Sequence, residues 1–529
     1  MARDREIELK LAIHPADVAA FRRLALLRGK GIDPPTRRQV FCVYFDTPGR
    51  ALKKHAMALR LCKIGGRWRQ TLKTAGNATG GLHERGEWEF PSSACQLDLA
   101  LFRETPLATL AGSEELHLRL KPIFTTEFQR TTWRVDISAG RRVEVALDQG
   151  VIRCGDRESP ISEVEIELLE GGVAAVFDWA LALAGQIALK PAILSKAERG
   201  YRLFRPEPLA PRRAGNIELK RNWIPQQAMR AIVAACLDHF EGNVDGALER
   251  DDPEYIHQLR VALRRLRSAM RIFTPVQDAP IFAEMKWLAI ALGDARNWDV
   301  LVTETLPALL DSYANPSLAT ELMGAATQRQ AAARAGARAA LVSPRETLLV
   351  LAVARRVSVH GEHAPPSLRA ASDDGATHGP PIHSLCQFAS HEIHRRHRLL
   401  PRSKGALAGL SAEALHRVRI DVKRLRYAVD FFASLFGKHR VARYLKVLDE
   451  IQTLLGEAND DTIAITLVQS LAPPERFVDF ARGWFAARTQ ARRARIDRHL
   501  AGLKSVKHFW GKNTVRTKPD GVSVTSDHD

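Results

Sequence analysis

Near the start of the chain, charged and apolar residues alternate over residues 6–10, with the sequence EIELK. Successive side chains of a β-strand point to opposite faces, so Glu6, Glu8 and Lys10 would share one face. Residues 162–168 repeat this pattern with three carboxylates, those of Glu163, Glu165 and Glu167. Stacked like charges repel, and a divalent cation relieves that repulsion, for which all-oxygen ligands suit Mg²⁺ or Mn²⁺. These segments therefore predict either solvated strand faces or a metal site.

Other alternating segments carry basic residues opposite apolar ones, at Arg60, Lys73 and Arg130, while Glu144 and Asp148 share a face of their own segment. A sheet that closes with these faces inward would enclose a wet tunnel lined by both acids and bases. Phosphoryl transfer uses that combination, because bases hold phosphate oxygens and carboxylates hold the metal that bridges them. The sequence contains no GxxxxGK[ST] loop, so a P-loop nucleotide site is not supported.

The elements that would position these residues are short strands, interrupted by helical patterns over residues 14–27 and 172–189. They predict an antiparallel sheet that closes into a barrel or tunnel. The eight strand candidates are residues 6–12, 40–46, 57–63, 68–74, 85–90, 130–137, 142–148 and 162–168.

After residue 205 the pattern becomes that of amphipathic helices, so the predicted fold class is a multidomain α+β protein. We expect a tunnel domain over residues 1–205, a proline-rich linker over 206–217 and an all-α domain over 218–508. A second proline-rich break, residues 364–381, divides that domain into halves at about 218–360 and 382–508. The polar residues 511–529 predict a disordered tail.

The two helical halves repeat one basic pattern, which predicts a duplicated helical unit. Charged residues three or four apart form a continuous stripe on a helix, which is unfavourable without an anion. A solvated face that forms salt bridges with neighbouring helices is the alternative. The segment HEIHRRH, residues 391–397, predicts an additional basic face in preference to a metal site. The repeated stripe consists of His257, Arg260, Arg264 and Arg267 in the first half, and of His416, Arg419, Lys423 and Arg426 in the second.

The formal net charge is +18, and its larger part falls after residue 210. Such an excess favours a polyanionic partner, although the stripes lack the interleaved aromatic residues that make nucleic acid a good candidate. The six cysteines form no CxxC pair and are expected to be reduced thiols. No signal peptide or membrane span is predicted, so we expect a cytoplasmic protein, with polyphosphate granules as one place of association.

Over about residues 1–205, the EIELK segment and several later motifs resemble those of the CYTH, or triphosphate tunnel metalloenzyme, superfamily and occur in the expected order. The resemblance implies an eight-stranded tunnel that hydrolyses triphosphates with Mg²⁺ or Mn²⁺. It implies metal ligands at Glu6, Glu8, Glu163 and Glu165, with Glu167 as a further candidate; phosphate contacts at Lys10, Arg60, Lys73, Arg130 and Lys196; and acidic lining at Glu144 and Asp148. The supporting motifs are YFDTP (44–48), ALRL (58–61), TLK (71–73), FQR (128–130), LDQG (147–150), EVE (163–165) and SKAERGY (195–201).

One departure is visible, because many members have Arg-x-Arg where this chain has Arg60-Leu61-Cys62. Lys63 or Arg69 could compensate for the missing arginine. The helical part, over about residues 218–508, is similar to the CHAD, or conserved histidine α-helical, domain. That resemblance implies two four-helix units whose basic pocket binds inorganic polyphosphate.

Three hypotheses follow. The first is an inorganic triphosphatase that cleaves tripolyphosphate to phosphate and pyrophosphate, with a polyphosphate-binding helical domain. The second is a tunnel enzyme that uses nucleoside triphosphates, such as a class IV type adenylate cyclase. The third is a non-catalytic polyphosphate-binding scaffold. Phosphate release from tripolyphosphate, ATP and long-chain polyphosphate distinguishes them.

Overall fold

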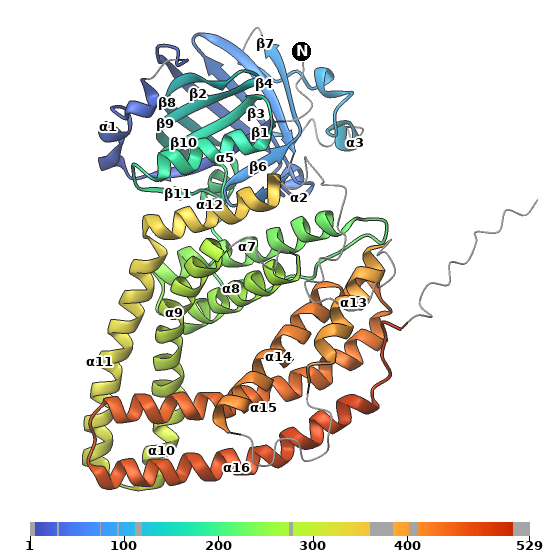
Figure 1. The fold of residues 1–529 in the computed structure, drawn as a ribbon. Coiled ribbons are helices and arrows are strands. Elements are labelled where there is room, and N and C mark those ends of the chain that lie inside the picture. Colours follow the sequence, from blue (N-terminus) through green and yellow to red (C-terminus); the bar gives the residue numbers. More distant parts are fainter. Residues whose placement is uncertain are drawn as a thin grey trace, which may run out of the picture.

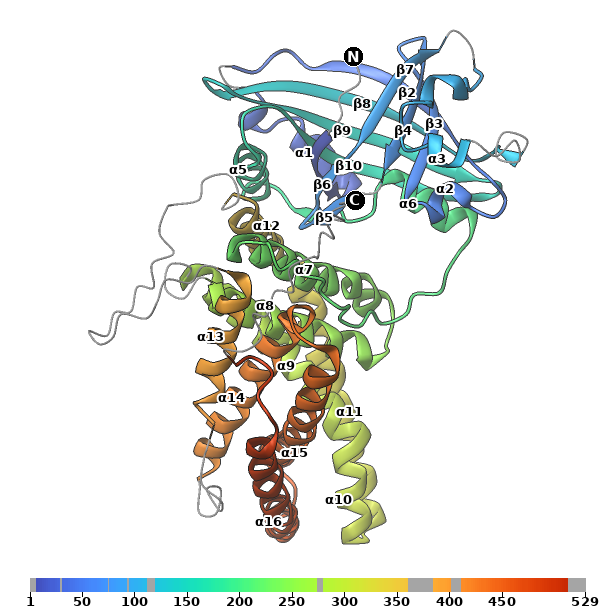
Figure 2. The same cartoon turned by 90° about the vertical axis from the view of Figure 1, so that its right-hand side faces the viewer.

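The computed structural model describes residues 6–28, 31–74, 76–92, 95–111, 119–273, 279–359, 384–400 and 411–511. Its N-terminal part is an antiparallel sheet curled into a half-barrel, and the C-terminal part consists of helices (Figure 1). The predicted fold class is therefore confirmed. Turned by 90°, the molecule shows the long strands lying across the end of the helical part (Figure 2).

Over the described residues the sheet has eleven strands, against the eight that the sequence predicted. It runs in the order β5-β6-β1-β10-β9-β8-β2-β3-β4-β7, with β11 pairing with β1. The strands are β1 (Glu6–Ile13), β2 (Thr36–Asp46), β3 (Met57–Ile64), β4 (Arg67–Thr74), β5 (Asn77–Thr79), β6 (Leu82–Arg85), β7 (Glu87–Ser92), β8 (Lys121–Ser138), β9 (Arg141–Cys154), β10 (Arg157–Glu170) and β11 (Leu189–Pro191).

A single glycine closes the curled sheet. Strand β6 pairs with β1 and strand β7 pairs with β4, and only Gly86 separates β6 from β7 in the chain. The amide of Thr74 donates to the carbonyl of Gly86 over 3.0 Å. The predicted strand over 85–90 is therefore two strands that belong to opposite ends of the pairing path. This short connection brings the two ends of the curled sheet together beside the tunnel.

The alternation of β1 separates two buried environments. Leu9 and Leu11 are fully buried in the apolar core that includes residues of α5 (Val173–Ala184), where each contributes roughly 1.5–3 kcal/mol. Glu8 and Lys10 point to the other face, yet each is only 3% exposed. The solvated-face alternative is therefore wrong for β1, and the charges face the inside of the tunnel.

The helical prediction for residues 14–27 is wrong as a single element. The segment forms three short turns, η1 (Pro15–Asp17), α1 (Val18–Phe21) and η2 (Ala25–Leu27). The second predicted helix, over 172–189, ends earlier, at Ala184, with Gly185 as its C-cap. The remaining short helices of this part are α2 (Ala51–Lys54), η3 (Leu99–Phe102), α3 (Ala108–Ala111) and α6 (Lys196–Phe204).

The helical part begins after an extended segment, residues 206–220. None of the described helices is long and apolar enough to cross a membrane. The proline-rich break at 364–381 and residues 512–529 of the predicted tail lie outside the described residues. The helices are α7 (Pro225–Glu249), α8 (Pro253–Phe273), α9 (Ala279–Val300), η4 (Leu301–Thr305), α10 (Leu306–Tyr313), α11 (Pro316–Leu341), α12 (Pro344–Val359), α13 (Leu385–His397), α14 (Ala412–Phe431), η5 (Ala433–Leu435), α15 (Lys438–Ser470) and α16 (Glu475–Ser505).

Two cysteines differ from expectation. Cys42 on β2 and Cys62 on β3 are register partners whose Cα atoms lie 4.0 Å apart, and they form a disulfide. The expectation of reduced thiols is therefore wrong for this pair. They are 20 residues apart in sequence, so only the sheet pairing brings them together. The other four cysteines are free thiols.

Candidate functional site: a charged tunnel and a basic helical cluster

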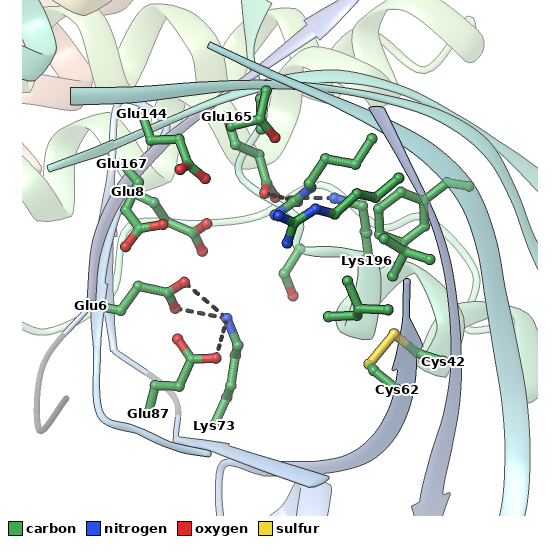
Figure 3. Close-up of a pocket in the computed structure, with 18 of the residues that line it drawn as sticks. Glu6, Glu8, Cys42, Cys62, Lys73, Glu87, Glu144, Glu165, Glu167 and Lys196 are labelled. Carbon is green, nitrogen blue, oxygen red and sulfur yellow. Dashed lines mark hydrogen bonds and ion pairs between the residues drawn. A yellow bond between two sulfur atoms is a disulfide. The ribbon is translucent and has the colours of Figure 1, made fainter. Parts of the chain in front are cut away.

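A cavity of about 560 Å³ occupies the inside of the curled sheet. Figure 3 shows Glu6, Glu8, Glu144 and Glu167 along one wall, with the disulfide on the opposite side. Asp148 and Glu163 are not among the lining residues, although both are buried beside it. The predicted site residues that line the cavity are Glu6, Glu8, Lys10, Arg60, Lys73, Arg130, Glu144, Glu165, Glu167 and Lys196.

Lys196 lies among three carboxylates at one end of the tunnel. It is the first residue of α6, whose N-cap Ser195 forms a capping box with Glu198. The Lys196 ammonium is 2.7 Å from a carboxylate oxygen of Asp148 and 3.0 Å from one of Glu165, and it also contacts Glu163. The helix start thus fixes a cation at the point where β9 and β10 present their acids.

Glu165 connects the cations of this end. It contacts Lys10, and its second oxygen accepts a hydrogen bond from Arg130, whose guanidinium also donates to Asp148 over 2.7 Å. Although burial alone would raise the pKa of Glu165, the ammonium groups of Lys10 and Lys196 and the Arg130 guanidinium hold that pKa well below its usual value. The carboxylate is therefore ionised at neutral pH.

A second charged group lies where β1 approaches β4 and β6. The Lys73 ammonium is 2.8 Å from Glu6 and 3.1 Å from Glu87. Arg85 donates to Glu6 over 3.1 Å and also contacts Glu8. Burial would raise the pKa of Glu6, but Lys73 and Arg85 lower it well below its usual value.

Arg85 is a residue that sequence reasoning did not assign to the site. Its partners Glu6 and Glu8 lie almost eighty positions earlier, and only the register of β1 with β6 places them together. A nearby signal existed in the sequence, because Arg85, Glu87 and Glu89 alternate with other residues as a charged face. The alternation indicated a charged strand face, but it did not show that Arg85 pairs with the acids of β1.

Arg60 occupies the β3 wall, where its guanidinium donates a long hydrogen bond of 3.4 Å to the hydroxyl of Tyr44. The cysteine two residues later belongs to the disulfide, so no second arginine follows. Lys63 and Arg69 do not line the cavity and hence do not compensate from there. Arg38, in register with Arg130, does line it.

Asp148, Glu163 and Glu165 are one group of carboxylates that could hold a metal ion. Each offers an oxygen, and these oxygens lie within 4.8 Å of one another. The set consists of hard oxygen donors, which suits Mg²⁺ or Mn²⁺ better than softer ions. Because the ammonium of Lys196 already lies among these oxygens, a metal bound there would have to displace or share that cation.

In the helical part, the basic stripes of α8 and α14 come together. Arg260 donates to the carbonyl of Gly293 on α9 over 2.8 Å. Burial and then Arg264 lower the pKa of Arg260 to about 10. Burial, followed by Arg264 and Arg419, lowers the pKa of Lys423 to about 6. These cations therefore lie near one another, and the Asp460 carboxylate offsets part of their charge.

The other predicted stripe residues have different surroundings. Burial and then Arg296 lower the pKa of His257 to about 4, so its ring is neutral at physiological pH. Arg267 faces Arg424, which with burial lowers the Arg267 pKa. His416 hydrogen-bonds the Asn459 side chain over 3.1 Å.

Two of the predicted basic groups, Arg426 and the segment 391–397, form contacts with other residues of the helical part. Arg426 of α14 forms an ion pair with Asp449 on α15. In the segment 391–397, the buried Arg396 pairs with Glu392, and His397 hydrogen-bonds the hydroxyl of Tyr444 over 2.7 Å. The segment is therefore partly a packing element.

Comparison with known proteins agrees with this geometry. A CYTH domain model matches residues 4–201 and a CHAD domain model matches residues 231–469. The chain is 35% identical over 217 residues to the inorganic triphosphatase of Haemophilus influenzae, a match that covers 38% of this chain and 55% of that protein. The chain thus spans about half the length of that relative.

Two further proteins are similar to this chain, one over most of its length and the other over its helical part. An uncharacterized protein of Mycobacterium tuberculosis is 25% identical over 506 residues, which are 88% of each chain. The CHAD domain from the plant Ricinus communis is 31% identical, with a TM-score of 0.45, over 56% of this chain and 98% of that structure. The chain thus contains a CYTH domain, over residues 4–201, followed by a CHAD domain, over residues 231–469.

Proposed function

We propose that the protein is a metal-dependent inorganic triphosphatase that hydrolyses tripolyphosphate to phosphate and pyrophosphate, and that its CHAD domain binds inorganic polyphosphate. The observation that carries the first part is the tunnel, where buried cations and ionised carboxylates line one cavity. The similarity of the CYTH part to a Haemophilus protein named as an inorganic triphosphatase supports it.

The cations of the tunnel would bind the phosphate chain. Arg130 and Lys196 lie at one end, Lys73 at the other and Arg60 on the wall between β2 and β4, so the phosphate oxygens can contact bases along the cavity. Bidentate guanidinium contacts orient a phosphate, and exclusion of bulk water strengthens each ion pair. Positioning of this kind is a large part of catalysis in phosphoryl transfer.

The carboxylates would hold the metal and keep the cations in place. Glu6, Glu8, Glu163 and Glu165 are the proposed ligands, with Glu167 as a further one, and Glu144 and Asp148 complete the acidic lining. A bound Mg²⁺ or Mn²⁺ would supply Lewis-acid polarisation of the phosphoryl group.

The deciding experiment is phosphate release by the full chain with tripolyphosphate, ATP and long-chain polyphosphate, each with Mg²⁺, Mn²⁺ or a chelator. We expect metal-dependent release of phosphate and pyrophosphate from tripolyphosphate. Preferred turnover of ATP would favour a nucleotide-using tunnel enzyme. Absence of turnover with every metal and substrate would contradict the enzymatic proposal and leave a binding scaffold.

The polyphosphate proposal rests on the cluster formed by Arg260, Arg264, Arg419 and Lys423. Burial and the neighbouring cations lower the pKa of Arg260 and of Lys423, so the protonated forms are unfavourable without an anion. A bound polyanion would stabilise the protonated forms, and its repeating phosphates suit a row of cations. Calorimetric titration with long-chain polyphosphate tests this, and heparin of similar charge serves as a control for non-specific attraction. Equal affinity for both would contradict a site built for phosphate.

A further inference from the structure

Lys10 lies at a junction on the outer edge of β1. Residues Glu6–Leu9 pair with β6, whereas Leu11–Ile13 pair with β11. Between these two pairings, the Lys10 amide donates to the Gly81 carbonyl over 2.9 Å, and the Lys10 carbonyl accepts from the Ala192 amide over 2.9 Å. On this edge the hydrogen bonds of the Lys10 backbone go to two short segments, whereas the opposite edge of β1 pairs with the continuous strand β10, where Lys10 is in register with Glu165.

The helical domain contacts the first of these segments. Gly80 precedes Gly81, and both have positive φ, of 58° and 80°. A Cβ built on Gly80 would lie 2.5 Å from the Cβ of Ala354 on α12, so this helix packs directly on the turn. From α7, the buried Glu241 carboxylate lies near the backbone of Gly80. The turn is thus held by two helices of the CHAD domain.

The second segment is held by the same helix. The hydroxyl of Thr347 on α12 donates over 2.7 Å to the carbonyl of Leu189 on β11, and both side chains are buried. Leu189 pairs with Ile13, three residues from Lys10. Figures 1 and 2 both show α12 between the sheet, with α5 on its face, and the rest of the helical domain.

The apolar core is also continuous across this boundary. Leu9 and Leu11 of β1 belong to the same buried cluster as Val350 and Ala354 of α12. Packed cores transmit small displacements because they contain little free volume. A displacement of α12 would therefore also displace β1, because the core between them is closely packed.

We infer that α12 of the CHAD domain is a positioning element of the tunnel: Thr347 and Ala354 fix the backbone of Lys10 through β11 and the Gly80–Gly81 turn. The Lys10 side chain then lies 2.8 Å from Glu8 and contacts Glu165. This inference rests on the proposed role of Lys10 as a phosphate contact. Its consequence is that the helical domain sets the alignment of a tunnel cation without touching the cavity.

The test compares three variants of the full chain. Thr347→Val removes the hydrogen bond to Leu189 at nearly constant volume, and Thr347→Ser retains the hydroxyl. Arg355→Ala breaks the exposed ion pair with Asp178 on α5, at the same interface but away from the Lys10 flank. Two readouts are used: kcat and KM with tripolyphosphate, and hydrogen exchange of the Lys10 amide.

We expect Thr347→Val to lower kcat/KM about tenfold, mainly through kcat, since small misalignments cost catalysis more than binding. Exchange of the Lys10 amide should become faster in the same variant. Thr347→Ser and Arg355→Ala should stay within about twofold of the wild type in both readouts. A fourth variant, Ala354→Val, adds bulk against Gly80 and should act like Thr347→Val.

Wild-type kcat/KM and wild-type exchange in both Thr347→Val and Ala354→Val would overturn the inference. An equal loss in Arg355→Ala would overturn it too, because interface stability alone would then explain the effect. If the wild type does not hydrolyse tripolyphosphate, the proposed function fails. The exchange of the Lys10 amide still decides whether α12 positions that residue.

Discussion

At the scale of single residues, Glu165 links three cations of the tunnel, because its carboxylate contacts Lys10, Lys196 and Arg130. Removing its charge would leave three cations of the tunnel undercompensated and would remove a proposed metal ligand. We expect Glu165→Gln to lower tripolyphosphate turnover at least about a hundredfold, measured by phosphate release over a range of Mg²⁺ and Mn²⁺ concentrations.

A control for this prediction lies on the same strand. Glu158 is exposed and pairs with Arg153 outside the tunnel, so Glu158→Gln should retain wild-type turnover. If Glu165→Gln also retains it, Glu165 is neither a metal ligand nor an organiser of the tunnel cations.

Lys423 leads to a prediction about pH. Its pKa of about 6, lowered by burial and by Arg264 and Arg419, leaves the side chain mostly neutral at pH 7. A bound polyanion favours the protonated form, so binding should take up a proton and become tighter as the pH falls from 8 towards 6. Titration calorimetry in buffers of different ionisation enthalpy measures this uptake.

Below about pH 6 the lysine is already protonated before binding, so the pH dependence from this group should flatten. Lys423→Met keeps most of the side-chain length and should abolish the proton uptake between pH 6 and 8. Uptake that persists unchanged in Lys423→Met would assign the linked proton to another group.

At the scale of elements, the polyphosphate cluster needs both helical halves, because α8 supplies Arg260 and α14 supplies Arg419. Charge-assisted hydrogen bonds are worth roughly 1.5–3 kcal/mol, so Arg260→Ala with Arg419→Ala should weaken polyphosphate binding at least about tenfold. Arg345→Ala with Arg482→Ala removes the same net charge from exposed ion-paired sites. Equal weakening in both double variants would show attraction by net charge alone.

The sequence predicted the elements whose pattern is local. Period-two alternation identified β1 and β10, and the repeated basic spacing identified α8 and α14, because each pattern depends on neighbours within a few residues. The same reasoning joined three short turns over residues 14–27 into one helix. Helical spacing of apolar residues does not show where tertiary packing interrupts the backbone.

Features that depend on register could not be predicted. The disulfide joins strands through the pairing of Cys42 with Cys62, and Arg85 reaches Glu6 through the pairing of β6 with β1. The position of Lys196 among carboxylates needs α6 to fold back on β9 and β10. These contacts join residues far apart in the chain, and no local spacing encodes them.

At the scale of the whole molecule, the interface between the two domains contains two buried acids. Burial raises the pKa of Glu346 on α12 to about 8. Burial, and then the nearby Glu346, raise the pKa of Glu241 on α7 to about 8 as well. Each acid lies beside a contact that holds the Lys10 backbone, since Glu346 precedes Thr347 and Glu241 lies near Gly80. Stability of the interface and alignment of the tunnel should therefore respond together to pH.

The sign of that response follows from linkage. A carboxyl whose folded pKa exceeds its unfolded value stabilises the protein fully below the unfolded pKa, and this contribution is lost as the pH rises towards the folded pKa. The thermal midpoint of the wild type should thus decrease as the pH rises from about 5 to about 8.

The Glu346→Gln variant cannot ionise at this position, so its thermal midpoint should decrease less over the same range. The midpoint of the variant should exceed that of the wild type most clearly at pH 8.5. Scanning calorimetry at pH 5.5, 7 and 8.5 measures both, with Glu158→Gln as the exposed control. A Gln variant less stable than the wild type at all three values would show that Glu346 is ionised and stabilising in the folded protein.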